Sequence, residues 1–127
     1  MKNKILVFTI LVTLFIISCN KKTNIVDIEF TKEVSFDTIK VGDTISKYFE
    51  IKNKSSTQLK IKNLKTSCGC TLAKLKDSII GKNSSTKIKV TFTAEEDNIG
   101  IVNKSIILDS NTKPNFTVMY LKGYVVK

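Results

Sequence analysis

The sequence has 127 residues, of which 42% are hydrophobic and 25% are charged, and its formal net charge is +10 at pH 7. Every basic residue is a lysine, and the lysines are scattered along the chain. Because the rigid guanidinium fork that reads phosphates and bases is missing, we expect no nucleic-acid partner. Histidine, the commonest general base, is absent as well. The carboxylates show no paired spacing, so we expect no catalytic residue, no enzymatic activity and no cofactor.

The beginning of the chain has the pattern of an exported lipoprotein. Two lysines within the first four residues precede the uncharged, apolar run Ile5–Ile17, which matches the two regions of a secretory signal. The small Ser18 directly before Cys19 resembles the lipobox of bacterial lipoproteins, in which the cysteine becomes the lipidated first residue. We therefore expect residues 1–18 to be a signal peptide and Cys19 to carry the lipid. An uncleaved anchor is the alternative, since a membrane-spanning helix needs about 20 apolar residues.

The rest of the chain is predicted to be one all-β domain. Residues 19–24 form a lipidated cysteine and short polar tether, and residues 25–127 are too few for two cores. From Lys87 to Ala94 apolar and polar residues alternate strictly, which is the period of a half-buried strand. The same alternation recurs at Phe49–Ile51, Leu59–Ile61, Ile106–Leu108 and Met119–Leu121. Short strands at this spacing predict an immunoglobulin-like β-sandwich.

One strand is predicted to be irregular, and turns separate the others. Leu59 and Ile61 predict an apolar side chain at Asn63, but the next apolar residue is Leu64, so we expect a β-bulge between them. Turn-forming residues lie at five places between the apolar runs. These are Val41–Asp43, Asn53–Thr57, Gly81–Ser85, Asp97–Gly100 and Ser110–Asn115.

Several segments of the chain together resemble the bacterial domain of unknown function 1573 family, and the most specific is the Thr-Ser-Cys-Gly-Cys-Thr sequence of Thr66–Thr71. The others are Phe36–Asp43, Phe49–Asn53, Leu59–Leu64, Ile88–Phe92, Asn103–Ile106, Ser110–Asn111 and Leu121–Gly123. The likeness covers approximately Asp27–Val126, although Lys82–Ser85 lacks the usual proline-glycine turn. It implies an immunoglobulin-type sandwich related to the domains of major sperm protein and of ciliary and centrosomal scaffolds. It also implies an exported, often lipid-anchored protein of the Bacteroidota, but no reaction.

Two further cysteines form the candidate chemical site. If Cys19 is consumed by lipid, Cys68 and Cys70 remain as an even pair. Gly69 between them is expected to form a tight turn, because glycine adopts backbone angles that other residues resist. Three roles stay open: a structural turn with or without a disulfide, a redox-active disulfide, and a copper(I) site, which two thiolates suit. Zinc is discounted, since no histidine or other cysteine completes its four ligands.

These patterns predict a non-enzymatic binding or scaffold module of the cell envelope. Its partners would be the membrane, through the N-terminal lipid, and an envelope protein or glycan; the net positive charge also suits an anionic cell-wall surface. The sequence after Cys19 lacks an acidic cluster, which favours the periplasmic face of the outer membrane. A passive structural component is the alternative. Three Asp-Ser/Thr-apolar triplets make Thr38, Thr44 and Ser78 candidate O-glycosylation sites.

Overall fold

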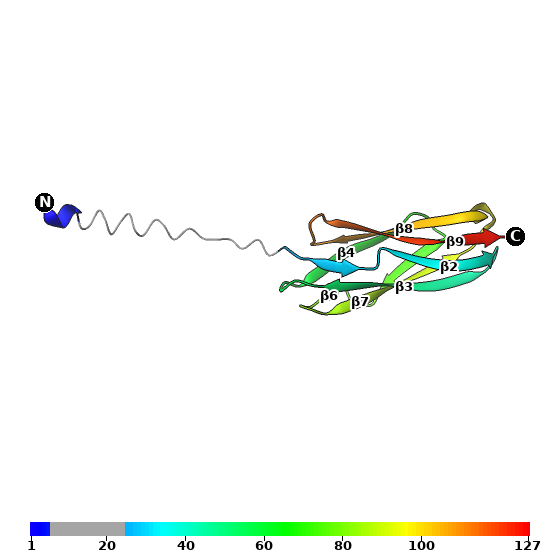
Figure 1. Cartoon of the computed structure of the whole chain (residues 1–127), viewed down its shortest axis with the longest axis horizontal. Helices are drawn as coiled ribbons and strands as arrows, with labels where there is room; N and C mark the ends of the chain where they lie inside the picture. The colour runs from blue at the N-terminus through cyan, green and yellow to red at the C-terminus, as the bar shows by residue number, and fades with distance from the viewer. Residues whose placement is uncertain (6–24) are drawn as a thin grey trace.

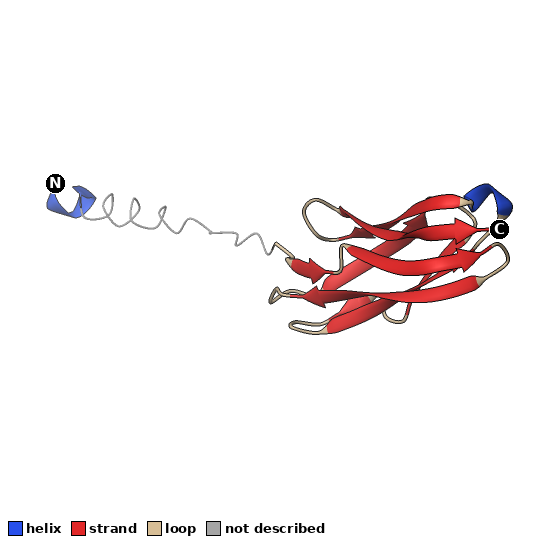
Figure 2. Ribbon diagram, turned by 45° about the vertical axis from the view of Figure 1, so that its right-hand side comes forward, coloured by secondary structure: helices blue, strands red, loops and turns tan. Residues whose placement is uncertain are grey.

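Two β-sheets face each other in the computed structural model, which describes residues 1–5 and 25–127 (Figure 1). The first, called here the β3–β7 sheet, has the strand order β1 (Ile28–Phe30), β3 (Thr44–Asn53), β7 (Ser85–Thr93) and β5 (Thr71–Leu75). The second, the β8–β9 sheet, has the order β2 (Glu33–Lys40), β9 (Phe116–Val126), β8 (Gly100–Ser110), β4 (Leu59–Thr66) and β6 (Ile79–Ile80). Within residues 25–127 the only helical segment is the 3₁₀ turn η2 (Glu96–Asn98) (Figure 2). The predicted β-sandwich is confirmed.

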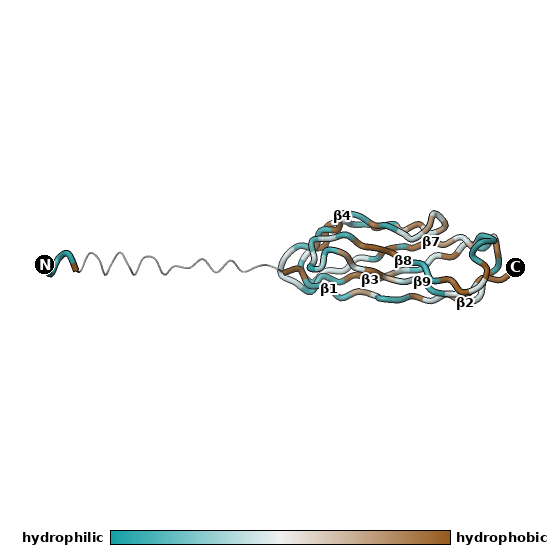
Figure 3. The backbone as a smooth tube through the Cα atoms, turned by 90° about the horizontal axis from the view of Figure 1, so that it is seen from above, coloured by the Kyte–Doolittle hydropathy of each residue, from teal (hydrophilic) through white to brown (hydrophobic). Residues whose placement is uncertain are grey.

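The core forms where the inward faces of the two sheets meet. On β7 the predicted alternation is confirmed, because Ile88, Val90 and Phe92 have no exposed surface while Lys87 and Lys89, which alternate with them, are exposed. Apolar and polar residues alternate along the strands in Figure 3. Full burial of such side chains contributes about 1.5–3 kcal/mol each. The other completely buried apolar residues are Phe49, Ile51, Leu59, Ile106, Leu108, Met119, Leu121 and Val125.

The predicted irregularity in β4 is confirmed. The pairing of β4 with β8 shifts register between Ile61 and Asn63, and Leu64 then pairs with Leu108. Because side chains in a strand alternate between faces, one extra residue returns Leu64 to the core side. Leu64 is half-buried and packs against the core.

The two ends of the sandwich differ in what they hold. The end at which Ile25 enters, called here the near end, carries the loops 54–58, 81–84 and 111–115. There Val26 is buried and forms a parallel bridge with Thr112. The opposite, far end carries the turn after β2, η2 and the C-terminus (Figure 1).

The signal peptide, the tether and the lipidated Cys19 lie mostly outside the described residues, so they remain predictions. In the part of the chain that the structure describes, no helix is long and apolar enough to cross a membrane.

Candidate functional site: the Cys68–Cys70 turn and the outer face of β9

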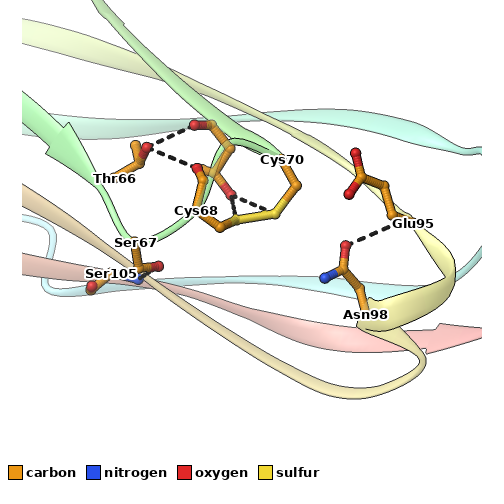
Figure 4. The surroundings of a disulfide bond; sticks show 8 residues. Thr66, Ser67, Cys68, Cys70, Glu95, Asn98 and Ser105 are labelled. Carbon is orange, nitrogen blue, oxygen red and sulfur yellow. Dashed lines mark hydrogen bonds between the residues drawn. A yellow bond between two sulfur atoms is a disulfide. The ribbon is translucent and has the colours of Figure 1, made fainter.

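The cysteine pair lies in the connection that carries the chain from one sheet to the other. β4 ends at Thr66 in the β8–β9 sheet, and β5 begins at Thr71 in the β3–β7 sheet. Between them Cys68 and Cys70 are joined by a disulfide, with an S–S distance of 2.01 Å and a Cα–Cα distance of 5.3 Å (Figure 4). The disulfide therefore closes a turn at the edge of the sandwich.

Hydrogen bonds hold this turn independently of the disulfide. The Thr66 hydroxyl donates to the backbone oxygens of Cys68 (3.1 Å) and Thr71 (2.8 Å). The Thr93 amide donates to the Cys70 oxygen at 3.0 Å, which ties the end of the turn to β7. A separate reciprocal pair links Ser67 to Ser105 on β8, at 3.0 and 3.1 Å. We infer that the turn keeps its path when the sulfur–sulfur bond is broken.

The sulfur atoms have one polar side-chain neighbour in the described structure. The Thr71 hydroxyl lies 3.5 Å from Cys68 Sγ and 3.8 Å from Cys70 Sγ, and Thr71 itself is 1% exposed. Both cysteines are half-buried, so a small thiol could reach them. Among the described residues no group of three or more His, Cys, Asp or Glu side chains could hold a metal ion. Because the two sulfurs are bonded to each other, copper(I) could bind them only after reduction.

The prediction that the turn needs glycine at position 69 for its backbone angles is wrong. The glycines with positive φ in the described chain are Gly42 and Gly100, and Gly69 is not among them. A Cβ added at Gly69 would meet nothing within 4 Å. The turn therefore does not require glycine for its backbone angles or for space at this position.

The three candidate glycosylation residues are exposed and lie on different elements. Thr38 is within β2, and Thr44 opens β3, where its hydroxyl shares a hydrogen bond of 3.1 Å with that of Thr93. Ser78 lies in the turn before β6, and its backbone oxygen accepts from the Ile61 amide. They remain predictions.

Strand β9 carries a feature that was not predicted from the sequence: its outward face is also apolar, except at Lys122. The inward residues Met119, Leu121 and Val125 are completely buried, as expected. The outward side chains alternate with them and pair in register with β8, so that Tyr124 faces Ile101 and Val118 faces Ile107. We call this the β9 surface: Ile101, Ile107, Phe116, Val118, Tyr120 and Tyr124. The nearly continuous apolar run of Phe116–Val126 was the signal for it.

The β9 surface is well exposed and is continued by a recess. Exposure reaches 87% at Ile101, 61% at Phe116 and 46% at Tyr124. At the near end, a pocket between β1 and the start of β9 is lined by Phe30, Pro114 and Phe116 among others. The apolar surface therefore combines a flat part with a concave one.

A comparison with known protein families shows to which family the domain belongs. A family model described as protein of unknown function (DUF1573) matches residues 26–125. The chain belongs to this family. No relative among curated proteins matches the sequence.

Three solved structures share the fold of this DUF1573 domain. A protein of unknown function from Porphyromonas gingivalis W83 has a TM-score of 0.73 at 13% identity, with 85% of this chain and 50% of that one covered. This chain thus spans half the length of that protein. PapD-like domain 7 of human CEP192 has a TM-score of 0.68 at 14% sequence identity, with 87% of this chain and 93% of that one covered. The Vibrio cholerae VesB protease has a TM-score of 0.55 at 9% sequence identity, with 79% of this chain and 32% of that one covered. At these identities the likeness is one of fold alone.

Proposed function

We propose that this protein is a non-enzymatic binding module of the cell envelope, anchored through lipid on Cys19 and facing the periplasm. The sequence pattern before Cys19 supports the anchor, and the absence of an acidic cluster directly after it supports the inner face of the outer membrane. The observation that carries the binding role is the β9 surface. A strand that is apolar on both faces is typical of sheets covered on both sides.

The composition of the β9 surface favours a folded protein as the partner. Aromatic residues are enriched at the cores of protein interfaces, and Tyr combines a large apolar ring with a polar tip. Polar residues lie among these apolar ones: Lys122, between Tyr120 and Tyr124 on the outward face of β9, forms an ion pair with Glu33 at 2.6 Å. Protein interfaces likewise combine apolar and aromatic side chains with polar, hydrogen-bonding groups. We therefore propose that an envelope protein covers β9.

The test adds charge to the β9 surface. In the variant Val118→Lys with Tyr124→Lys, two lysines replace outward side chains of β9 that are exposed in the isolated chain, so folding stability should change by less than about 0.5 kcal/mol each. We expect the wild-type protein, extracted from envelopes in mild detergent, to migrate in native gels as a complex. The variant should migrate as the free protein.

The matched control adds the same charges elsewhere. Ser56→Lys with Gln58→Lys places two lysines in an exposed near-end loop and should leave the complex intact. Equal migration of both variants with the wild type would overturn the proposal. Thermal unfolding of each purified variant shows whether the domain is folded.

A second candidate is thiol–disulfide exchange at the Cys68–Cys70 turn, and the half-buried disulfide is the observation that favours it. A thiolate of a partner would attack one sulfur and form a mixed disulfide, while the other sulfur leaves as a thiolate. The Thr71 hydroxyl, 3.5 Å from Cys68 Sγ, could donate a hydrogen bond to that thiolate. Because the loop has only three residues, the loop-entropy model gives this disulfide ~1.6 kcal/mol of stabilisation at most.

We expect Cys68→Ser with Cys70→Ser to lower the free energy of unfolding by no more than ~1.6 kcal/mol, because the hydrogen bonds of the turn remain. Urea unfolding of the variant and of the oxidised wild-type protein measures the difference. A loss of about 3 kcal/mol or more would show that the disulfide stabilises the fold, and would contradict a role in thiol–disulfide exchange. Thiol counting by mass spectrometry across a glutathione series then shows whether the bond opens under mild reduction.

A further inference from the structure

The outer face of the β3–β7 sheet has a groove lined by lysines. It lies across β3, β7 and β5. Its basic lining is Lys74, Lys76, Lys87 and Lys89, and Tyr48 stands at its β3 side. These four lysines are scattered along the sequence, but strand pairing brings them into one groove.

The register of the strands explains why these lysines lie close together. Lys89 lies on β7 between two neighbours, with Tyr48 opposite it on β3 and Lys74 opposite it on β5. Like charges placed directly opposite each other on neighbouring strands destabilise a sheet. The pair Lys74 and Lys89 is therefore a cost to the folded domain on its own.

No ion pair within the described residues offsets this charge. The two salt bridges there are Lys54 with Glu29 and Lys122 with Glu33, and neither involves a lysine of the groove. Glu50 lies opposite Lys87 in register, and Asp77 lines the end of the groove, but neither forms an ion pair with these lysines. The groove thus holds an excess of positive charge that an anionic ligand would neutralise.

Tyr48 indicates which kind of anion fits. Its side chain is 57% exposed beside Lys89, and an exposed aromatic ring next to an ammonium group can stack on a sugar ring while the lysine contacts its acidic substituent. The groove is also open and crosses three strands, which suits an extended chain. We propose that this groove binds an acidic polysaccharide that bears carboxylates along linear pyranose units. This site lies on the other sheet from the β9 surface, so it goes beyond the proposed function and can fail separately from it.

The test uses the full protein purified in detergent, with polygalacturonate as the probe and neutral dextran as its uncharged counterpart. We expect binding to polygalacturonate but not to dextran, and about tenfold weaker binding of polygalacturonate by Lys74→Glu with Lys89→Glu, since two attractions become repulsions. The matched control is Lys62→Glu with Lys65→Glu on β4, which makes the same charge change at two exposed lysines of the other sheet. It should bind within about twofold of the wild type.

Two more measurements separate this site from general charge attraction. Tyr48→Ser should weaken binding of polygalacturonate severalfold but leave binding of inorganic polyphosphate unchanged. In the absence of ligand, Lys74→Glu alone should raise the midpoint of thermal unfolding, because it replaces a repulsion with an attraction to Lys89; this also shows that the variant folds.

Two results would contradict the proposed polysaccharide site. Equal weakening by the β5–β7 and β4 double variants would mean attraction to the net charge and would overturn the site. Binding to detergent micelles that contain phosphatidylglycerol, lost in Lys74→Glu with Lys89→Glu while polygalacturonate does not bind, would assign the groove to a lipid surface and also overturn it.

Discussion

Gly123→Ala is expected to lower the free energy of unfolding by about 3 kcal/mol. A Cβ added at Gly123 would lie 2.3 Å from Cε2 and 2.4 Å from Cζ of Phe36, far inside van der Waals contact. Gly123 is on the core-facing side of β9, in the same phase as Leu121 and Val125. The ring of Phe36 occupies the space that a side chain at this position would fill.

The Phe36 ring has little room to move away. It is 7% exposed and packs on Phe92 with ring centroids 5.5 Å apart. Phe92 in turn has no exposed surface and is part of the core. Relief of the collision would therefore shift two aromatic rings or separate the paired strands β2 and β9, and both displacements lose packing.

Urea unfolding followed by circular dichroism measures this effect. Gly69→Ala is the control for the loss of a glycine, since its Cβ would meet nothing within 4 Å, and it should stay within about 0.5 kcal/mol of the wild type. Adding Phe36→Leu to Gly123→Ala should recover part of the loss, because the smaller side chain leaves room for a methyl group. If Gly123→Ala were as stable as the wild type, the packing of Phe36 over Gly123 would be wrong.

Asn53→Ala is expected to cost about 3 kcal/mol as well, through unpaired polar groups. Asn53 has no exposed surface. Its Nδ2 lies 2.8 Å from the Thr57 oxygen and 3.1 Å from the oxygens of both Ile80 and Gly81, and its Oδ1 accepts from the Ser55 amide and hydroxyl. One side chain thus joins the loop after β3 to β6 and to the loop before β7.

Removing this amide leaves several polar groups at the near end without a hydrogen-bond partner. Each buried polar group without a partner costs about 1–3 kcal/mol. Asn53→Asp keeps the acceptor for Ser55 but loses both donors, so we expect it to recover little of the stability. Asn103→Ala, at an exposed position on β8, is the control and should be close to neutral. Hydrogen exchange should show loss of protection concentrated at the near end; protection equal to that of the wild type would contradict this role.

The strands were predictable because a half-buried strand shows its period directly in the sequence. The bulge at Asn63 was predictable for the same reason, since an apolar pattern that changes phase within one strand indicates an inserted residue. Asn53 was predicted to open a turn, and its Oδ1 does accept from the Ser55 amide two residues on, but its burial and its bonds to Ile80 and Gly81 were not predicted. Its phase with Phe49 and Ile51 placed it on the core side, and that was the available signal.

The candidate sites depend on features that the order of residues does not contain. Whether Cys68 and Cys70 pair depends on the path of the turn between the sheets. Lys74 and Lys89 are 15 residues apart, and only the register of β5 on β7 places them opposite each other. The β9 surface shows its apolar character in the sequence, but which of its residues point outward follows from their pairing with β8.

Site-specific photocrosslinking in intact cells tests directly whether an envelope protein covers β9. A photoreactive benzoylphenylalanine replaces Val118, and the same residue at the exposed Glu96 in η2 is the control. We expect a single adduct at position 118, larger than the protein by the mass of a different polypeptide, and none at position 96. No protein adduct at position 118, or the same adducts at both positions, would contradict it.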